Sequence, residues 1–198
     1  MMELVFATNN KHKLKEISAL LGSDIHLVSL DELGIREEIP EDFLTIEENA
    51  LAKARYVFKL TGRDVFADDT GLEVKALGGV PGVYSARFAG ENKDFEKNID
   101  KVLEMLKNSD DREACFRSVI ALIKDGREYL FEGRVNGIIL RERRGKEGFG
   151  YDPVFLPDGY DHTFAEMPLD RKNQISHRAE AFRKLKMFLM RNSDSGNN

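Results

Sequence analysis

Two adjacent acids, Asp68 and Asp69, follow the apolar run of residues 65–67. Neighbouring carboxylates repel each other unless a cation or a proton compensates their charge. A bound Mg²⁺ would do so, because magnesium takes a few carboxylates together with water and phosphate oxygens. A turn with one capping and one solvated Asp is an equal explanation. The position after an apolar strand favours the functional interpretation, because open α/β sheets bind ligands at the carboxyl ends of their strands.

A second polar segment, residues 8–13, reads Thr8-Asn9-Asn10-Lys11-His12-Lys13 and lies between a predicted strand and a predicted helix. The free backbone N–H groups at a helix start attract anions, and adjacent lysines add positive charge. The segment therefore suits phosphate binding, although a polar N-cap with solvated lysines is the better explanation of these six residues taken alone. It is not a Walker loop, because no G-x-x-x-x-G-K-[ST] motif occurs in the chain.

Two further charged residues are less distinctive. Lys53 lies on a predicted helix, where a solvated lysine is the simpler explanation. Glu41 is one acid of a charged loop that also holds Glu37, Glu38 and Asp42, and spacing alone does not single it out.

The stretch 145–153 combines three glycines with an aromatic pair and a carboxylate. Phe149 or Tyr151 could stack on a planar base, which contributes about 1–3 kcal/mol for a good stack. A structural loop with buried aromatic rings is the alternative. Further along, Lys172, His177 and Arg178 gather before and within the first turn of the last predicted helix. Cations at a helix amino end oppose its dipole, so their placement suggests an anionic ligand.

The hydrophobic pattern alternates strands with helices, which is typical of α/β proteins. A capping box at Thr45 and Glu48 predicts a helix that ends near Gly62 and that turns Asn49 and Lys53 away from its apolar face. The other expected elements are strands at 3–7, 25–30, 65–67, 116–123 and 129–135, and helices at 95–106 and 176–190. A further helix is expected after Asn10, with Leu14, Ile17, Leu20 and Leu21 at helical spacing up to a terminating Gly22. The last two strands form a hairpin at Asp125-Gly126, so antiparallel pairing joins the parallel part.

Composition limits the possible partners. The 198 residues, 41% of them hydrophobic, predict one folding unit over 1–191 and a polar, disordered tail over 192–198. Lys and Arg number 30 against 35 Asp and Glu, and the net charge of −5 argues against nucleic acid and anionic membranes as partners. One cysteine excludes an internal disulfide and fits a reducing cytosol. No apolar run approaches the roughly 18 residues of a membrane helix.

Five segments together resemble one family, the inosine/xanthosine triphosphate pyrophosphatases. They span almost the whole chain in matching order and spacing: Thr8 to Lys13; Glu48-Asn49-Ala50 with Lys53; Ala67 to Leu72; Gly79 to Arg87; and Phe149 to Pro153 with Ser176-His177-Arg178. The resemblance implies a mixed central sheet with flanking helices and two lobes, with the active-site cleft between them. It also implies a cytoplasmic homodimer that uses Mg²⁺ to hydrolyse ITP, dITP and XTP to the monophosphate and pyrophosphate.

The family's functional residues transfer position by position. Asp69 matches the general base, and Glu41, Asp68 and Asp69 match the metal ligands, with Glu41 in a loosely matching loop. The implied substrate-binding residues are Thr8, Asn9, Asn10, Lys11, His12, Lys13, Lys53, Thr70, Phe149, Gly150, Tyr151, Asp152, Lys172, His177 and Arg178. Of these, Asn10, Lys13 and Lys53 would meet the phosphates, and the residues from Phe149 onward the nucleoside.

Two other functions remain open at the level of sequence. The Maf-type pyrophosphatases share this architecture and cleave modified pyrimidine triphosphates, although the Ser176-His177-Arg178 and Phe149–Asp152 segments favour a purine substrate. A non-catalytic nucleotide sensor would use the same phosphate-binding residues. The acidic pair separates a sensor from an enzyme, because a pure binder gains nothing from an acid near the scissile phosphate.

Overall fold

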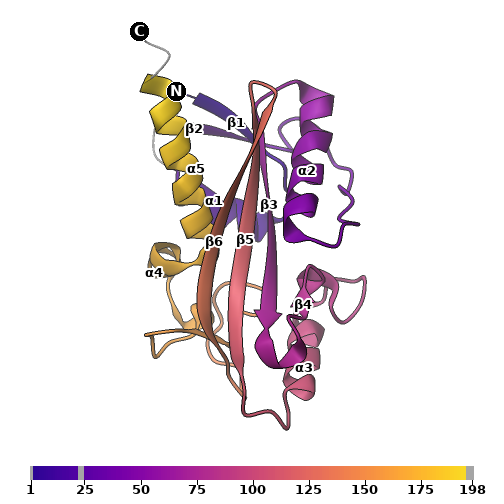
Figure 1. Cartoon of the computed structure of the whole chain (residues 1–198), viewed down its shortest axis with the longest axis vertical. Helices are drawn as coiled ribbons and strands as arrows, with labels where there is room; N and C mark the ends of the chain where they lie inside the picture. Colours follow the sequence, from indigo (N-terminus) through magenta and orange to yellow (C-terminus); the bar gives the residue numbers. More distant parts are fainter. Residues whose placement is uncertain (1, 22–24, 195–198) are drawn as a thin grey trace. The chain divides into compact units, whose positions relative to one another are not determined.

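The computed structural model of the chain describes residues 2–21 and 25–194. In this described part, a seven-stranded mixed sheet has the strand order β2-β1-β3-β5-β6-β7, and β4 pairs with β3 (Figure 1). β1 is parallel to β2 and β3, whereas the β3–β4 and β6–β7 pairs are antiparallel. The predicted α/β class with a mixed central sheet is confirmed.

The strands are β1 (Met2–Phe6), β2 (Ile25–Ser29), β3 (Val65–Val74), β4 (Pro81–Gly82), β5 (Glu113–Lys124), β6 (Arg127–Ile139) and β7 (Phe155–Pro157). The α-helices are α1 (Lys11–Ser18), α2 (Ile46–Thr61), α3 (Phe95–Met105), α4 (Leu169–Ile175) and α5 (His177–Asp194). Three short 3₁₀ helices are η1 (Lys75–Leu77), η2 (Ser85–Arg87) and η3 (Phe164–Glu166). No helix among the described residues is both long and apolar enough to cross a membrane.

The chain divides into two compact units. Unit 1 comprises Met1–Asp69, Ser118–Gly133 and Arg178–Asn198, and unit 2 comprises Thr70–Arg117 and Arg134–His177. The long strands β3, β5 and β6 contribute residues to both units.

In unit 1, α1 and α5 lie on one side of the strands and α2 lies on the other (Figure 1). The α1 and α5 side has a core of buried residues that includes Leu4, Phe6, Ile17, Phe66, Ile120, Phe182 and Leu185. The rings of Phe6 and Phe66 stack with centroids 4.5 Å apart, which ties β1 to β3. This packing fixes the carboxyl end of β1, from which the 8–13 segment leaves.

Helix α2 begins and ends where the sequence predicts. The Thr45 hydroxyl accepts from the Glu48 N–H at 3.2 Å, and Gly62 ends the helix with a left-handed φ of 64°. The prediction for its faces is wrong, because Asn49 and Lys53 are buried together with Ala50, Ala54 and Val57. Their burial depends on polar partners outside the helix, which its periodicity does not reveal.

Strand β3 is longer than predicted. The sequence ends it at Ala67, but the strand continues to Val74, so the acidic pair lies inside it. Its register with β1 ends at Phe6↔Phe66, and β4 pairs farther on with Leu72 and Glu73. Asp68 and Asp69 therefore lie just beyond the carboxyl end of β1, the parallel neighbour of β3. They are still at the carboxyl end of the parallel part of the sheet, as expected.

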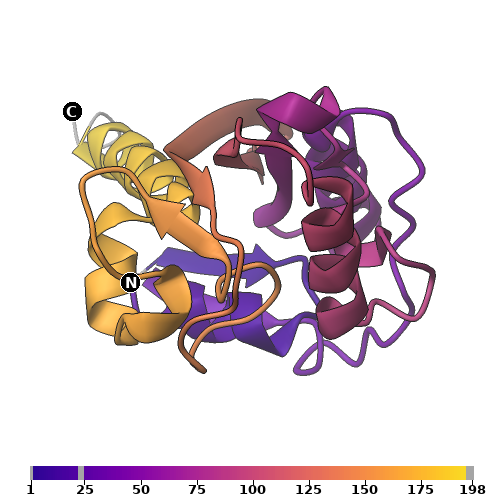
Figure 2. The same cartoon turned by 90° about the horizontal axis from the view of Figure 1, so that it is seen from below.

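Unit 2 has a separate core. Its buried residues include Leu72, Ile99, Val102, Phe116, Val154, Phe155 and Phe164, and the rings of Phe116 and Phe155 lie 4.6 Å apart. Helices α3 and α4 lie at opposite sides of this unit (Figure 2).

The remaining predicted bounds need adjustment. The first helix starts at Lys11, directly after Asn10 as predicted, but it ends at Ser18 rather than continuing to Leu21, and Gly22 lies outside the described residues. The hairpin turn is confirmed, with positive φ at both Asp125 and Gly126. Helix α5 continues to Asp194, so residues 192–194 are helical rather than part of a disordered tail, and 195–198 lie outside the described residues.

Candidate active site

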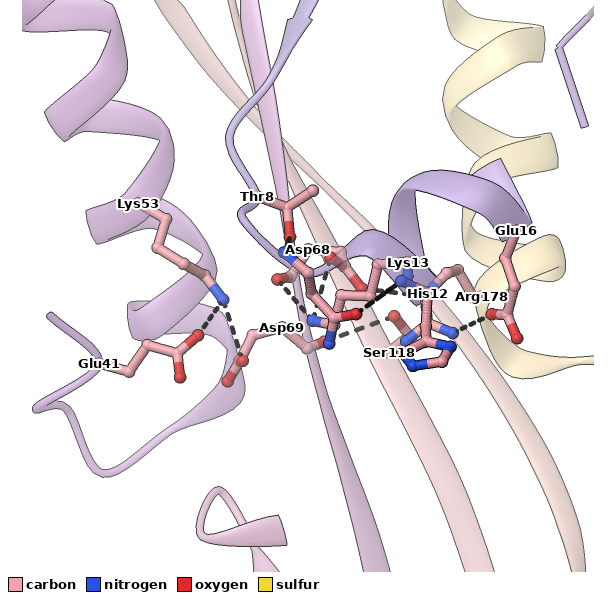
Figure 3. Close-up of polar contacts among 11 residues, drawn as sticks. Thr8, His12, Lys13, Glu16, Glu41, Lys53, Asp68, Asp69, Ser118 and Arg178 are labelled. Atoms are coloured by element: carbon pink, nitrogen blue, oxygen red, sulfur yellow. Dashed lines mark hydrogen bonds and ion pairs between the residues drawn. The ribbon is translucent and has the colours of Figure 1, made fainter. Parts of the chain in front are cut away.

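The Asp68 carboxylate lies between two cations of unit 1 (Figure 3). Its Oδ1 is 3.1 Å from Lys13 Nζ, and its Oδ2 accepts from Arg178 Nε at 3.1 Å. The Arg178 guanidinium also pairs through Nη1 with Glu16. All of these groups are buried or nearly so, and Asp68 itself is 1% exposed. The result is a buried chain of alternating charges rather than a solvated turn.

Burial alone would raise the pKa of Asp68, but Lys13 and Arg178 hold it well below its usual range. Burial lowers the pKa of Lys13, against the opposing effect of Asp68. Burial would also lower the pKa of Arg178, but Glu16 and Asp68 raise it. The two cations therefore favour the charged form of Asp68, and Asp68 in turn favours the charged forms of Lys13 and Arg178.

Asp69 has a different environment on the next residue of the strand. Its Oδ1 is 3.1 Å from Lys53 Nζ, and the same ammonium lies 2.5 Å from Glu41 Oε1. Burial raises the pKa of Asp69 and Glu41 raises it further, although Lys53 opposes the change. The two neighbouring acids thus have pKa values shifted in opposite directions, which is typical of sites that assign them different roles.

Local hydrogen bonds position these acids. The Asn49 amide accepts from the Phe43 N–H at 3.0 Å and donates to the Phe43 carbonyl at 3.2 Å, which anchors the loop that carries Glu41 to helix α2. The fully buried Ser118 hydroxyl on β5 donates to the Asp69 backbone carbonyl at 3.4 Å. Both contacts hold the backbone that presents the carboxylates.

The 8–13 segment has the geometry of a helix start. Asn10 caps α1, with its Oδ1 accepting from the N–H groups of His12 at 2.9 Å and Lys13 at 3.2 Å. The Asn10 N–H donates to the Thr8 hydroxyl, and the Asn9 side chain donates to the Glu37 carbonyl. The sequence-level capping explanation is therefore correct for Asn10, and the cap also directs Lys13 toward Asp68.

A pocket of about 470 Å³ lies beside this segment in unit 1. It brings together four of the predicted substrate residues with part of the loop after β2; its lining residues are Thr8, Asn9, Asn10, Lys11, Leu14, Ser29, Asp31, Arg36 and Glu38. Lys11 and Arg36 give it two cationic side chains. His12 is exposed and does not line this pocket.

The three predicted metal ligands are only partly brought together. Among residues 2–21 and 25–194, no group of three or more His, Cys, Asp or Glu side chains converges on one point. Glu41 and Asp69 share Lys53, whereas both oxygens of Asp68 face Lys13 and Arg178. Glu41 and Asp69 fit a divalent ion, because magnesium sites commonly use one or two carboxylates and complete their shell with phosphate oxygens and water.

A second polar cluster lies in unit 2. Asp152 Oδ2 accepts from Lys172 Nζ at 2.6 Å and from the Phe149 N–H at 2.8 Å. Both charged side chains are 3% exposed. The Lys172 ammonium also lies 5.3 Å from the centre of the Phe149 ring. The predicted residues Phe149, Asp152 and Lys172 are thus brought together, and Phe149 stays partly exposed.

The other predicted unit 2 residues occupy distinct positions. Tyr151 is 3% exposed and its hydroxyl donates to the Ser85 carbonyl at 2.8 Å, so of the aromatic pair only Phe149 offers an exposed ring. His177 is buried and stacks on Phe116 with ring centres 4.7 Å apart. Thr70, next to Asp69, and Gly150 are both partly exposed.

Sequence reasoning missed several residues of these clusters. Glu16 lies 162 positions from Arg178, and no local signal distinguishes it from the other acids of the chain. Ser118 lies in an apolar strand, where a polar residue on the buried face is the one available signal. Arg36 belongs to a charged loop without a motif.

Comparison with known proteins decides the family. A family model described as the Ham1 family matches residues 4–188. The chain belongs to the Ham1 family. The "dITP/XTP pyrophosphatase" of Christiangramia forsetii is 54% identical to this Ham1 chain over 188 residues, covering 95% of the chain and 99% of the relative. The protein of the same name from Porphyromonas gingivalis is 53% identical over 191 residues, covering 96% and 98%.

A solved structure agrees with the Ham1 assignment. The HAM1 protein from Coxiella burnetii is 41% identical, with a TM-score of 0.88, over 96% of this chain and 100% of the other. The resemblance recognised from the five segments is therefore confirmed at the level of family and fold.

Proposed function

We propose that this chain hydrolyses non-standard purine nucleoside triphosphates, ITP, dITP and XTP, to the monophosphate and pyrophosphate. The buried acidic pair carries the proposal. Asp68 and Asp69 stand side by side on one strand, with Lys13, Lys53 and Arg178 around them. Two buried carboxylates among cations suit a polyanionic ligand and a reaction at phosphorus. The names of the relatives, at more than half identity, supply the substrate class.

A divalent cation, which we take to be Mg²⁺, fits beside Glu41 and Asp69, with Asp68 as the adjacent acid. When bound, it would neutralise phosphate charge and lower the pKa of a coordinated water. The Lys53 ammonium holds the carboxylates of Glu41 and Asp69 in place and would also contact the phosphates. Lys13 and the backbone at the start of α1 would hold the remaining phosphate charge without regard to the base.

Asp69 is the group best suited to accept the proton of the attacking water. Asp69 is 6% exposed and its pKa is raised, so its carboxylate is a stronger base than that of an ordinary Asp. Asp68 is held as an anion by its two cations and is the weaker base. Asp68 would therefore stabilise the site, and Asp69 would orient or deprotonate the water.

Following the family resemblance, selection of the base is assigned to the residues implied to meet the nucleoside: Phe149, Gly150, Tyr151, Asp152, Lys172, His177 and Arg178. Inosine and xanthosine carry a 6-oxo acceptor where adenine carries a 6-amino donor. A hydrogen-bond donor of the protein pairs with the 6-oxo group but faces another donor in the 6-amino group. Each such buried mismatch costs about 1–3 kcal/mol. Phe149, the exposed ring of the loop, is placed to stack on the base.

Following the family, we further propose that the enzyme acts as a homodimer in the cytoplasm. Sedimentation of the purified protein across a range of concentrations tests the dimer. A constant monomer mass up to millimolar concentration would contradict it.

The experiment that tests the activity is pyrophosphate release with Mg²⁺ across ITP, dITP, XTP, GTP, ATP and dTTP. We expect the first three to be cleaved at least about tenfold more efficiently than ATP, the effect of one mismatched contact at position 6. GTP shares the 6-oxo group, so its rejection must act at the 2-amino group. Preference for the pyrimidine would instead indicate Maf-type chemistry. Binding of ITP without release of pyrophosphate would indicate a sensor.

A further inference from the structure

The turn at η2, Ser85–Arg87, takes no part in the chemistry proposed above, although it is held by buried hydrogen bonds within unit 2. The Ser85 hydroxyl accepts from the Leu72 N–H at 2.8 Å and donates to the Gly82 carbonyl at 2.6 Å. The turn is thus fixed to strand β3 and to the glycine-rich turn before it.

The Ser85 carbonyl accepts two further hydrogen bonds. One comes from the Tyr151 hydroxyl at 2.8 Å and the other from the Asn98 amide of helix α3 at 3.4 Å. The same amide donates to the Ala86 carbonyl at 2.9 Å, and its oxygen accepts from the Ala89 N–H at 2.7 Å. Asn98 is 2% exposed, so it clamps the turn and is not available to a ligand.

Tyr151 connects this clamp to the Phe149–Asp152 loop. The loop has two buried anchors, the Tyr151 hydroxyl at Ser85 and the Asp152 carboxylate at Lys172. The Asp152 carboxylate also accepts a hydrogen bond from the Phe149 N–H. The two anchors therefore fix the position of the partly exposed Phe149 ring. The anchor at Tyr151 connects to Asn98 through the Ser85 carbonyl, which both side chains contact.

We propose that Asn98 is a positioning residue for nucleobase selection, acting through the Ser85 carbonyl and the Tyr151 hydroxyl on the loop that carries Phe149. This rests on the proposed function, in which that loop meets the base. Selection between bases is sensitive to small displacements of the loop. A loosely held aromatic ring stacks on any base, and a loosely held hydrogen-bonding group at the edge of the base discriminates poorly between bases. In the proposed function the phosphates are bound by other residues, Lys13 and Lys53, so the effect should fall on the base and not on phosphate binding.

Two variants remove the connection at different points. Tyr151→Phe deletes the hydroxyl and keeps the ring, and Asn98→Leu replaces the amide by an apolar side chain of similar size. For each variant we expect KM for ITP to rise about five- to tenfold with kcat within about twofold, because each removes one of the two donors to the Ser85 carbonyl and the loss is expressed in ground-state binding. The preference for ITP over GTP should shrink by the same factor.

Lys101→Ala is the matched control. Lys101 lies one turn from Asn98 on α3 and also donates to this segment, at the Phe88 carbonyl, but it does not reach Ser85. It should keep the wild-type KM and ITP/GTP ratio. The double variant Asn98→Leu/Tyr151→Phe should lose no more than the worse single variant, because both act through one carbonyl.

The outcomes separate this proposal from the activity itself. A wild-type protein that releases no pyrophosphate from ITP removes the proposed function and the positioning role with it. An active wild type whose Tyr151→Phe variant keeps the KM and the ITP/GTP ratio overturns the positioning role alone. So does a double variant whose losses multiply, or a fall in kcat shared equally by all triphosphates. Tyr151→Phe decides the matter if Asn98→Leu fails to fold.

Discussion

Arg178 donates from Nε to Asp68 Oδ2 at 3.1 Å, a buried ion pair between residues 110 positions apart. The second partner of the guanidinium, Glu16, is also buried. Two of its nitrogens are thus committed to carboxylates, and the orientation of the side chain is set by them. Any contact that Arg178 makes with a nucleoside therefore depends on the ion pair with Asp68.

Replacing Arg178 by Ala should lower the free energy of unfolding by about 3–5 kcal/mol, because two buried carboxylates lose their shared cation. It should also raise KM for ITP and reduce the preference for ITP over ATP. Urea denaturation and steady-state kinetics measure the two effects. Arg183→Ala, an exposed position on the same helix, is the control and should change stability by less than about 0.5 kcal/mol. An unchanged ITP/ATP ratio in Arg178→Ala would refute base recognition by this residue.

Lys53→Met should weaken the hydrolysis of ITP, dITP and XTP by the same factor. The Lys53 ammonium pairs with Glu41 and Asp69 and, in the proposed function, contacts the phosphates. None of these contacts involves the nucleobase. Comparison of kcat/KM across the three substrates measures this. Lys59→Met on the exposed side of the same helix should leave all three values near wild type. Loss confined to one base would contradict the phosphate role.

Removing divalent cations should abolish pyrophosphate release, and adding Mg²⁺ should restore it. Glu41→Gln should raise the Mg²⁺ concentration needed for half-maximal rate by about tenfold or more, because one of the two carboxylates that share Lys53 loses its charge. Asp42→Asn, an exposed neighbour in the same loop, is the control. Full activity in the presence of excess chelator would contradict a metal requirement.

Gly148→Ala should destabilise the Phe149 loop far more than Gly159→Ala. Both glycines have positive φ, +74° and +80°, so the cost of backbone strain is shared. At Gly148 an added Cβ would also lie 2.1 Å from Asp152 Oδ2, whereas at Gly159 it would meet nothing within 4 Å. The difference in melting temperature between the two variants isolates the Asp152 contact. Equal melting temperatures would show that the Phe149 loop accommodates the added Cβ at Gly148 with no loss of stability.

The sequence predicts those elements that carry their own local signals. Thr45, Asn10 and Gly62 define helix ends by side-chain capping or left-handed geometry, and Asp125-Gly126 defines a hairpin turn, so these features appear as expected. Strand β3 is predicted too short because acids and a glycine interrupt its apolar pattern. Its continuation depends on neighbouring strands that the local sequence does not specify.

The site is predicted less completely, for the same physical reason. Asp68, Asp69 and Lys53 are recognisable by type and spacing, but their ion-pair partners come from distant segments. The burial of Lys53 requires Glu41 and Asp69 on other elements, so helical periodicity alone places it in solvent. Glu16 has no signal until the fold brings it to Arg178.

In the proposed function Asp69 acts in the chemical step and not in substrate binding. The most direct test of this role is Asp69→Asn, measured for ITP binding by calorimetry and for pyrophosphate release in single turnovers, with the exposed Asp158→Asn as control. We expect Asp69→Asn to bind ITP within a few-fold of wild type and to release pyrophosphate at least about 100-fold more slowly, the usual contribution of a positioned base. Turnover near the wild-type rate would contradict it.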